Sequence, residues 1–297
     1  GGPETLLRLE AATLARIEAL QHRLDAEGRR WRAGPTGISS LSPEAFQRLL
    51  GAVPPTTNEW TPPLDDGGHR PKDGALSVGG AFAAAGDVQA LPARWDWRER
   101  DGVTAARHQG DCGGCWAFAA AGAVEGLLRI YDDRVTDLSE QQALDCNTAG
   151  YGCDGGWMTG AYRLWQTEGA LSEALHPYRG EDHGTCPGPP PQPEASVLTW
   201  SAVHSTQAAI KRALLAGPVA VGMHVYADFQ HYGGGVYDHD GSDEINHAVL
   251  LVGWDDVLGA WILKNSWGER WGEGGFAYVA YGSCRLGSYP HRLRIPA

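Results

Sequence analysis

Residues 109–118 read QGDCGGCWAF, a glycine-rich turn that runs straight into an apolar stretch with Cys115 at the junction. The apolar residues continue through Leu128, so the pattern predicts a buried helix that begins at Cys115. A helix N-terminus presents unpaired N–H groups and the positive end of the helix dipole, and both stabilise an anion. A thiol at this position ionises more readily than a free one, which makes Cys115 a candidate nucleophile.

A thiolate nucleophile needs a base, and one candidate lies far downstream. His247 precedes the apolar, strand-like residues 248–252, where its imidazole can pair with the Cys115 thiolate and later protonate a leaving amine. Asn265, in the run KNSWG, offers an amide oxygen that can fix the orientation of the ring. Taken singly, these signals are weak, because a Cys-x-x-Cys pair is as often redox-active or metal-binding and a lone histidine is more often structural.

The spacing of the three residues along the chain supports a shared catalytic role. His247 follows Cys115 by 132 residues, and Asn265 follows it by 150. A Cys-Gly-Ser/Ala-Cys-aromatic run with His and Asn roughly 130 to 150 residues downstream is typical of papain and the cathepsins. From about Leu91 to the C-terminus the chain resembles the papain family, and the resemblance rests on motifs in the family's order, among them LPARWDWRERDGVTAARHQGDCGGCWAF, LSEQQALDC, GCDGGWM, INHAVLLVGW and KNSWGERWGEGG.

The resemblance implies a role for each residue of a peptidase reaction. Cys115 attacks the peptide carbonyl, His247 is its base, and Asn265 orients that base. Gln109 donates its side-chain amide to the oxyanion hole together with the Cys115 backbone N–H, where donors stabilise the developing charge. Trp267 shields the bond between His247 and Asn265 from water. The reaction is expected to need neither a metal nor an organic cofactor.

The resemblance also assigns substrate contacts. Gly155 and Gly156 are expected to hydrogen-bond an extended peptide backbone, because glycine lets a strand approach closely. The walls of the second specificity pocket are expected to be Trp157, Met158, Ile245, Asn246 and Ala248. Such a wall favours an apolar substrate side chain, such as Leu, Phe or Val. The alternative is that Trp157 and Met158 simply pack in the core.

The chain has six cysteines, four of them in loop-like contexts. The resemblance implies two disulfides, Cys112 with Cys153 and Cys146 with Cys186, and leaves Cys284 as a free thiol. A zinc site built from Cys112, Cys115, Cys146 and Cys153 is the alternative, but its spacing is unusual and it leaves His247 unexplained. Disulfides indicate an oxidising compartment, so we expect a secreted, lysosomal or vacuolar protein whose targeting peptide lies outside this sequence.

The first 90 residues have a different character. In residues 5–31, helical spacing links Leu7, Leu14, Ile17, Leu20 and Leu24, which predicts an amphipathic helix. Ser42 followed by Pro43 predicts the start of a second, short helix. From Pro54 to about residue 90, Pro, Gly, Asp and Thr dominate, which indicates an extended linker and places a boundary near residue 90.

Residues 39–51, SSLSPEAFQRLLG, resemble the end of the inhibitory propeptide in cathepsin L-like zymogens. The resemblance implies that residues 1–90 are a propeptide, which packs on the enzyme and threads its tail through the cleft in the direction opposite to substrate. The family's long-helix motif is only partly present: Glu4 and Arg8 fit, whereas Ala12, Ala15 and Ala19 do not. Two departures in the active half are Gly114, where relatives usually carry Ser or Ala, and His176 in place of the first Tyr of a Tyr-Pro-Tyr run.

The expected fold is α+β and papain-like, with a helical lobe over about residues 91–200, a β-barrel-like lobe over 201–297 and the active-site cleft between them. Apolar runs at 219–225 and 248–252 predict strands of the second lobe. The proline-rich residues 186–193 are expected to cross between the lobes. They lack the histidine-bearing insertion of carboxypeptidase relatives, so endopeptidase action is expected.

The net charge of −12 argues against nucleic-acid and anionic-membrane partners, and no apolar run approaches the roughly 18 residues of a membrane span. The expected partners are protein or peptide substrates, the chain's own propeptide and cystatin-type inhibitors, and the protein is expected to be a monomer. One alternative is a catalytically silent homologue that acts as a binding or inhibitory module, which the filled catalytic positions disfavour. Another is a transpeptidase or ligase that uses the same acyl-enzyme, since only water access to the cleft separates the two outcomes.

Overall fold

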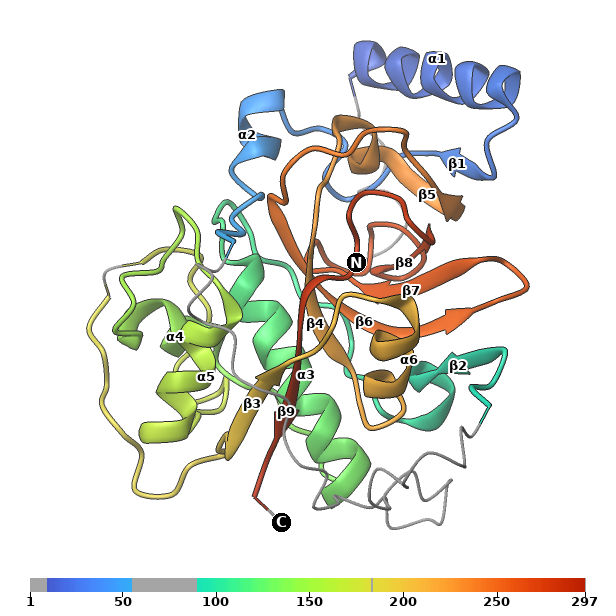
Figure 1. Cartoon of the computed structure of the whole chain (residues 1–297). Coiled ribbons are helices and arrows are strands. Elements are labelled where there is room, and N and C mark those ends of the chain that lie inside the picture. Colours follow the sequence, from blue (N-terminus) through green and yellow to red (C-terminus); the bar gives the residue numbers. More distant parts are fainter. Residues whose placement is uncertain (1–9, 55–89, 183, 297) are drawn as a thin grey trace.

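The computed structural model describes residues 10–54, 90–182 and 184–296, in which helices pack beside one large sheet (Figure 1). The helices are α1 (Ala11–Glu27), α2 (Pro43–Gln47), α3 (Cys115–Asp132), α4 (Glu140–Cys146), α5 (Met158–Thr167) and α6 (Gln207–Leu214), with short 3-10 helices η3 (Trp97–Arg100) and η4 (Ala227–His231). The strands are β1 (Trp31–Ala33), β2 (Arg94–Asp96), β3 (Thr199–Ala202), β4 (Val219–Met223), β5 (Tyr232–Tyr237), β6 (His247–Asp255), β7 (Ala260–Lys264), β8 (Phe276–Ala280) and β9 (Ser288–Arg294).

Strand β6 lies at the centre of the sheet. The strand order is β1-β5-β8-β7-β6-β4-β9-β3, and β2 pairs with β6 off this path. The path does not close on itself, so the lobe expected to resemble a barrel is an open sheet. Residues 247–254 of β6 are all buried, because α3 and α6 both pack against this strand. A strand covered in this way has a continuous apolar run instead of an alternating one.

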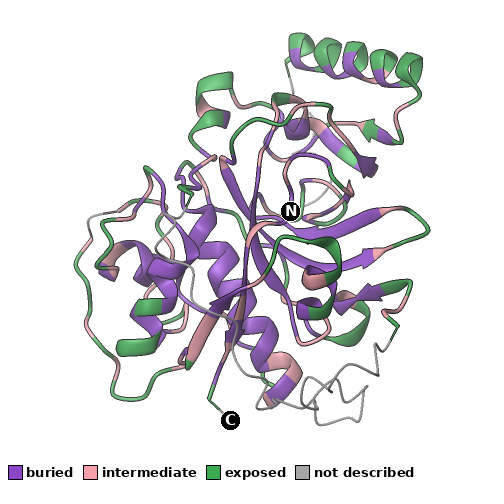
Figure 2. Ribbon diagram, viewed as in Figure 1, coloured by how far each residue is buried: buried purple, intermediate pink, exposed green. Residues whose placement is uncertain are grey.

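Helix α3 forms the core of the molecule and joins the helical side to the sheet. It begins at Cys115, as the sequence predicts, and continues four residues past Leu128. Small residues let it approach the sheet: a Cβ on Gly122 would lie 3.0 Å from Cδ2 of Leu250. Figure 2 shows α3 buried along most of its length. Within the described residues, no helix combines the length and apolarity that a membrane span requires.

Helices α4 and α5 lie on the opposite side of α3 from most of the sheet (Figure 1). This helical side carries both disulfides, Cys112–Cys153 and Cys146–Cys186, which close loops with sequence separations of 41 and 40 residues. By the chain-entropy account, each contributes about 4 kcal/mol by restricting the unfolded chain. Because three of the four cysteines of the alternative zinc site are paired in these bonds, that alternative is excluded.

The proline-rich residues 186–193 do not cross between the two sides, contrary to expectation. They contain neither a helix nor a strand. Pro193 still lies against Gly169 on the helical side, where its Cβ is 2.4 Å from the position of a Cβ on that glycine. Ala195 then forms a bridge with Ala170. The chain reaches the sheet only at β3, which pairs with β9.

The N-terminal helix is shorter than the pattern over residues 5–31 predicts. It ends at Glu27, because Gly28 adopts a left-handed conformation with φ of 67°. Ile17, Leu20 and Leu24 are buried as expected, but Leu14 is 42% exposed. Leu7 of the predicted stripe lies outside the described residues, as does most of the predicted linker after residue 54.

The segment after α1 forms strand β1, where the sequence predicts more helix. Trp31 is buried and packs its indole edge-on against Tyr237, with ring centroids 4.9 Å apart. β1 pairs with β5 through Trp31 and Gly235, so the N-terminal region extends the edge of the sheet. Arg29 lies just after α1 and forms an ion pair with Asp238 at 2.7 Å.

Helix α2 begins as the sequence predicts. The Ser42 side chain accepts a hydrogen bond from the Ala45 backbone N–H, and proline occupies the first turn. Phe46 on this helix is buried and packs edge-on against Trp267, at a centroid distance of 5.5 Å. The N-terminal region therefore contacts the sheet side through both β1 and α2.

The contact between α3 and β6 gives a direct test of stability. Leu250 is 2% exposed and faces Gly122 of α3, so a Leu250→Ala variant leaves a cavity and should lower the free energy of unfolding by about 2 to 5 kcal/mol. Urea unfolding followed by tryptophan fluorescence measures the change. Val257→Ala, at a side chain that is 90% exposed, is the matched control and should stay within about 0.5 kcal/mol of the parent. Equal midpoints for the two variants would show that this contact is not part of the stabilising core.

Candidate active site

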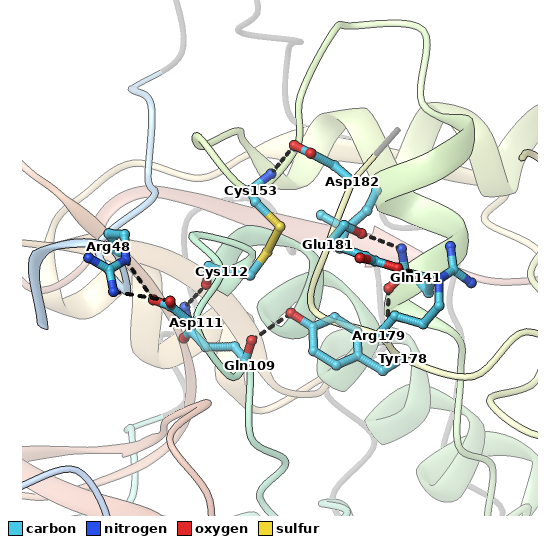
Figure 3. Close-up of a disulfide and its surroundings, with 12 residues drawn as sticks. Arg48, Gln109, Asp111, Cys112, Gln141, Cys153, Tyr178, Arg179, Glu181 and Asp182 are labelled. Atoms are coloured by element: carbon cyan, nitrogen blue, oxygen red, sulfur yellow. Dashed lines mark hydrogen bonds and ion pairs between the residues drawn. A yellow bond between two sulfur atoms is a disulfide. The ribbon is translucent and has the colours of Figure 1, made fainter. Parts of the chain in front are cut away.

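The position of Cys115 is fixed by the turn before α3. Gly114 is the N-cap residue, and the Gly113 backbone N–H donates to the Cys153 carbonyl at 2.8 Å. The neighbouring Cys112–Cys153 disulfide ties this turn to the helical side (Figure 3). Cys115 is wholly buried, and burial raises the pKa of its thiol, while the nearby Ala248 backbone N–H opposes this shift. The thiol therefore lies near the start of β6, whose first residue is His247.

His247 is held by residues from the loop after β7. Nε2 of His247 lies 2.8 Å from Oδ1 of Asn265 in a bond that is buried on both sides. The same amide oxygen accepts the Ser266 backbone N–H at 2.9 Å. Trp267 lies over the imidazole with ring centroids 4.9 Å apart and is itself wholly buried. Asn265 and Trp267 thus fix one edge and one face of the ring, and no hydrogen bond from the described part of the chain reaches Nδ1.

Burial sets the charge state of the thiol and the imidazole in the intact chain. It raises the pKa of Cys115 to about 11, against smaller opposing contributions from backbone N–H groups, the first being that of Ala248. Burial also lowers the pKa of His247 to about 4, although the bond to Asn265 opposes this shift. At neutral pH both groups are uncharged here, because charging either in a dry environment is costly.

Gln109 contributes an oriented amide to the same place. Its Oε1 accepts a 2.6 Å hydrogen bond from the Ser266 hydroxyl, so the amide nitrogen must point the other way. That nitrogen donates to the carbonyl oxygens of Cys112 at 2.7 Å and Leu49 at 2.9 Å. The Gln109 backbone carbonyl is fixed in turn by the Tyr178 hydroxyl at 2.7 Å, as Figure 3 shows.

Residues 49–53, here called the covering segment, run across these groups, from a turn at Leu49 into a bridge at Ala52. The Gly156 backbone N–H donates to the Gly51 carbonyl at 2.8 Å, and the Val53 N–H donates to the Gly156 carbonyl at 2.9 Å. This pairing places Ala52 and Gly156 in a parallel bridge. On the opposite side, the Ala52 N–H donates to the Asn246 carbonyl at 3.1 Å. The segment thus spans from the helical side to β6.

Only glycine fits at the centre of the covering segment. A Cβ on Gly51 would lie 1.9 Å from the Gly113 carbonyl oxygen, which is far inside contact distance. The Gly51 backbone N–H also lies near the Cys115 thiol, where it opposes the rise in pKa that burial causes. Just before the segment, Arg48 forms a two-point ion pair with Asp111, with Nε at 2.7 Å and Nη2 at 3.0 Å from the carboxylate oxygens (Figure 3). Both side chains of this pair are mostly exposed, so it stabilises the contact little.

Comparison with known proteins agrees with this geometry. A family model described as papain family cysteine protease matches residues 91–291, more than half of the chain. The chain belongs to the papain family of cysteine proteases. Zingipain-2 from Zingiber officinale is 38% identical over 214 residues, which cover 67% of this chain and 96% of that protein. Cathepsin K from Mus musculus is 40% identical over 198 residues, which cover 64% of this chain but only 60% of the length of that relative.

Solved structures of similar proteins extend the likeness to the N-terminal region. Digestive procathepsin L 3 from the Tenebrio molitor larval midgut has a TM-score of 0.79 at 27% identity, over 97% of this chain and 95% of that one. A recombinant stem bromelain precursor also has a TM-score of 0.79, at 26% identity and over 99% of this chain and 96% of that one. The papain-like fold and its relation to zymogen structures are therefore established.

Of the residues predicted for the second pocket, Asn246 bonds the covering segment through its carbonyl, and the five side chains differ in what they do. Trp157 and Met158 are wholly buried, and Ile245 and Ala248 are nearly so. The Asn246 side chain does not contribute to an apolar wall. Its Oδ1 accepts from the Val225 N–H at 2.8 Å and its Nδ2 donates to the Val225 carbonyl at 3.2 Å, so the amide ties two strand ends together.

Sequence reasoning missed two residues of this papain-family site. Ser266, which orients the Gln109 amide, stands in the quoted KNSWG run next to Asn265, so its position alone marks it for attention. Gly222 lies on β4 and faces Trp157 and Ile245. A glycine inside a strand often marks a close approach by another group, and that signal was available at residue 222.

Proposed function

We propose that this papain-family protease is a cysteine endopeptidase that hydrolyses peptide bonds through a Cys115 acyl-enzyme. The arrangement of Cys115 and His247 carries the proposal. The sulfur sits at the first residue of α3, against the N–H of the residue that follows His247, and Asn265 holds that histidine at 2.8 Å. A nucleophile, a base and a group that orients the base are the three parts that acyl transfer requires.

The chemistry follows from these positions once the covering segment has left. Water and substrate then reach the pair, and the proton moves from Cys115 to His247, because the helix N-terminus favours the thiolate and the Asn265 oxygen favours the imidazolium. The thiolate attacks the peptide carbonyl, whose oxygen takes the place beside the Gln109 amide nitrogen that the Leu49 carbonyl holds in the intact chain. His247 protonates the leaving amine and then activates the water that releases the acyl group.

The full chain is proposed to be an autoinhibited zymogen in which residues 1–90 form the propeptide. The Leu49 carbonyl accepts a hydrogen bond from the Gln109 amide, so that donor is not free for a substrate. The Gly51 carbonyl and the Val53 N–H bond the N–H and the carbonyl of Gly156. The covering segment pairs with Gly156 in the parallel direction, so it occupies the cleft in the direction expected to be opposite to that of a substrate. The zymogen structures with similar folds support this division of the chain.

The proposed substrates are peptides or unfolded proteins with an apolar residue in the second pocket, whose walls include Met158, Ile245 and Ala248. Cystatin-type inhibitors are proposed partners, and the protein is proposed to act as a monomer. The two disulfides favour a secreted or lysosomal location. Gly155 is expected to add a backbone contact to substrate beside Gly156.

The contact between the N-terminal region and the enzyme contains groups that titrate. The pKa of Asp111 and of Asp240 is held below the ordinary value of 3.8, chiefly by hydrogen bonds from Arg48 and Arg29 respectively. A carboxyl whose pKa is lowered by docking favours docking at higher pH and stops doing so only as the pH falls through the lowered pKa. These ion pairs therefore release the propeptide only below about pH 4.

His231 responds to milder acid. Its Nδ1 lies 2.9 Å from the Ser39 hydroxyl of the N-terminal region. Burial lowers the pKa of His231 below 6.5, Arg16 lowers it further, and Asp228 opposes the shift. The docked state thus binds fewer protons than the released state, so docking weakens as the pH falls below 6.5. We infer that protonation of His231 starts maturation near residue 90.

The catalytic roles predict a specific labelling and rate pattern. A bromelain protease with a similar fold has been solved in complex with the E64 inhibitor, so E64 is a suitable probe for the matured protein. Mass spectrometry should locate the adduct on Cys115, and Cys115→Ala should abolish labelling and cleavage. Gln109→Ala should lower kcat by about 10² to 10³, because it removes one donor to the oxyanion.

Gln207→Ala, at an exposed glutamine on α6, is the matched control and should cleave like the parent. Labelling of another residue, or full casein cleavage by Cys115→Ala, would refute the assignment. Slow water attack with efficient transfer to an added amine would instead favour the transpeptidase alternative.

The His231 proposal predicts a shift in the pH of maturation. The parent zymogen should process itself as the pH falls below about 6, whereas His231→Gln, which keeps a hydrogen-bonding side chain but does not titrate, should need a pH lower by about one unit. His22→Gln, at an exposed histidine of α1, should behave like the parent. Gel analysis across pH 4 to 7 measures the profile. Identical profiles for the parent and His231→Gln would exclude His231 as the trigger.

A further inference from the structure

The Trp157 indole, an expected wall of the second specificity pocket, lies against Gly222 of β4. Its Cη2 lies 3.1 Å from the position that a Cβ on Gly222 would take, and Cδ1 of Ile245 lies 2.7 Å from the same position. Because Gly222 has no side chain, the indole and the isoleucine close over β4. The large ring of Trp157 fits here only because residue 222 is glycine. Any other residue at 222 would have to displace Trp157 or Ile245.

The far side of the ring is held by the enzyme itself. Trp157 packs edge-on against Tyr289, with centroids 5.9 Å apart, and against His291 at 6.2 Å, both on β9. None of these residues belongs to residues 1–90. These two contacts do not involve the covering segment, so they remain to hold the ring when that segment leaves.

The depth of the second pocket can be judged from Ala52, the residue of the covering segment between Asn246 and Gly156. Ala52 is bonded to Asn246 on one side and paired with Gly156 on the other, and it contributes only a methyl group. Even so, Trp157 and Met158 are 0% exposed and Ala248 is 1% exposed. A deep pocket under a single methyl group would leave wall surface that water could touch. The depression beneath Ala52 is therefore shallow.

We propose that Trp157 and Gly222 restrict the second pocket to small apolar side chains, such as Ala and Val, and exclude Phe. The inference rests on the proposed peptidase function and narrows its apolar preference. A bulky aromatic side chain would have to displace a buried indole from its contacts with β9 and β4, whereas a valine adds only two methyl groups to the place that Ala52 fills.

The experiment compares fluorogenic peptides that differ only in the residue two positions before the cleaved bond, namely Ala, Val, Leu or Phe. The full chain is first matured, and active sites are counted with E64. We expect kcat/KM for Val to exceed that for Phe at least tenfold. Trp157→Leu, which opens the floor of the pocket, should raise the Phe-to-Val ratio at least tenfold.

Two further variants keep the test decisive if Trp157→Leu does not fold. Trp157→Phe retains an aromatic ring of smaller size and should shift the ratio in the same direction by a smaller factor. Trp200→Phe replaces a tryptophan outside the predicted pocket wall that packs against Tyr162, and it should keep the parent ratio.

The possible failures are distinguishable. A parent enzyme that cleaves the Phe peptide as well as the Val peptide overturns this inference but leaves the peptidase function standing. An unchanged Phe-to-Val ratio of kcat/KM in a folded Trp157 variant also overturns this inference and leaves the peptidase function standing. Absence of both E64 labelling and hydrolysis of every peptide overturns the proposed function, and the inference with it.

Discussion

The packing of α3 against β6 is the constraint on which the rest of the structure depends. Cys115 is the first residue of α3 and His247 is the first residue of β6. Their proximity is therefore set by how a helix lies on a strand, and Gly122 against Leu250 is one contact that fixes this relation. The disulfide at Cys112 and the bond from Asn265 refine the position of each end. In the proposed account, the positions of the catalytic pair are set by the packing of the two buried elements that carry it.

The same burial explains why the intact chain holds the pair in an uncharged state. The covering segment excludes water, and exclusion of water raises the pKa of Cys115 and lowers that of His247. In the proposed account, the segment blocks chemistry twice. It forms the hydrogen bonds with Gly156 and the Gln109 amide that a substrate would form. It also removes the solvation that charge separation requires. Displacing this segment reverses both effects.

Much of this arrangement could be predicted from the sequence, because its signals are local. The start of α3 at Cys115, the cap at Ser42 and the buried β6 strand each follow from residues within one or two turns or one strand. The features that the sequence did not predict depend on contacts between distant segments. The exposure of Leu14 is one example, since the helical pattern alone does not say which side faces the enzyme. Another is the fit of Trp157 over Gly222, which depends on the relative placement of α5 and β4.

The charge state of the Cys115 sulfur decides whether the proposed chemistry can occur, and thiolate absorbance in the ultraviolet measures it most directly. The signal is measured between pH 5 and 7 before and after removal of the N-terminal region, with Cys115→Ser as the reference for each form. The account predicts no thiolate in the intact chain and a full equivalent in the matured enzyme. A neutral thiol in the matured enzyme across this range would contradict it, as would a thiolate that is already present while residues 49–53 cover the site.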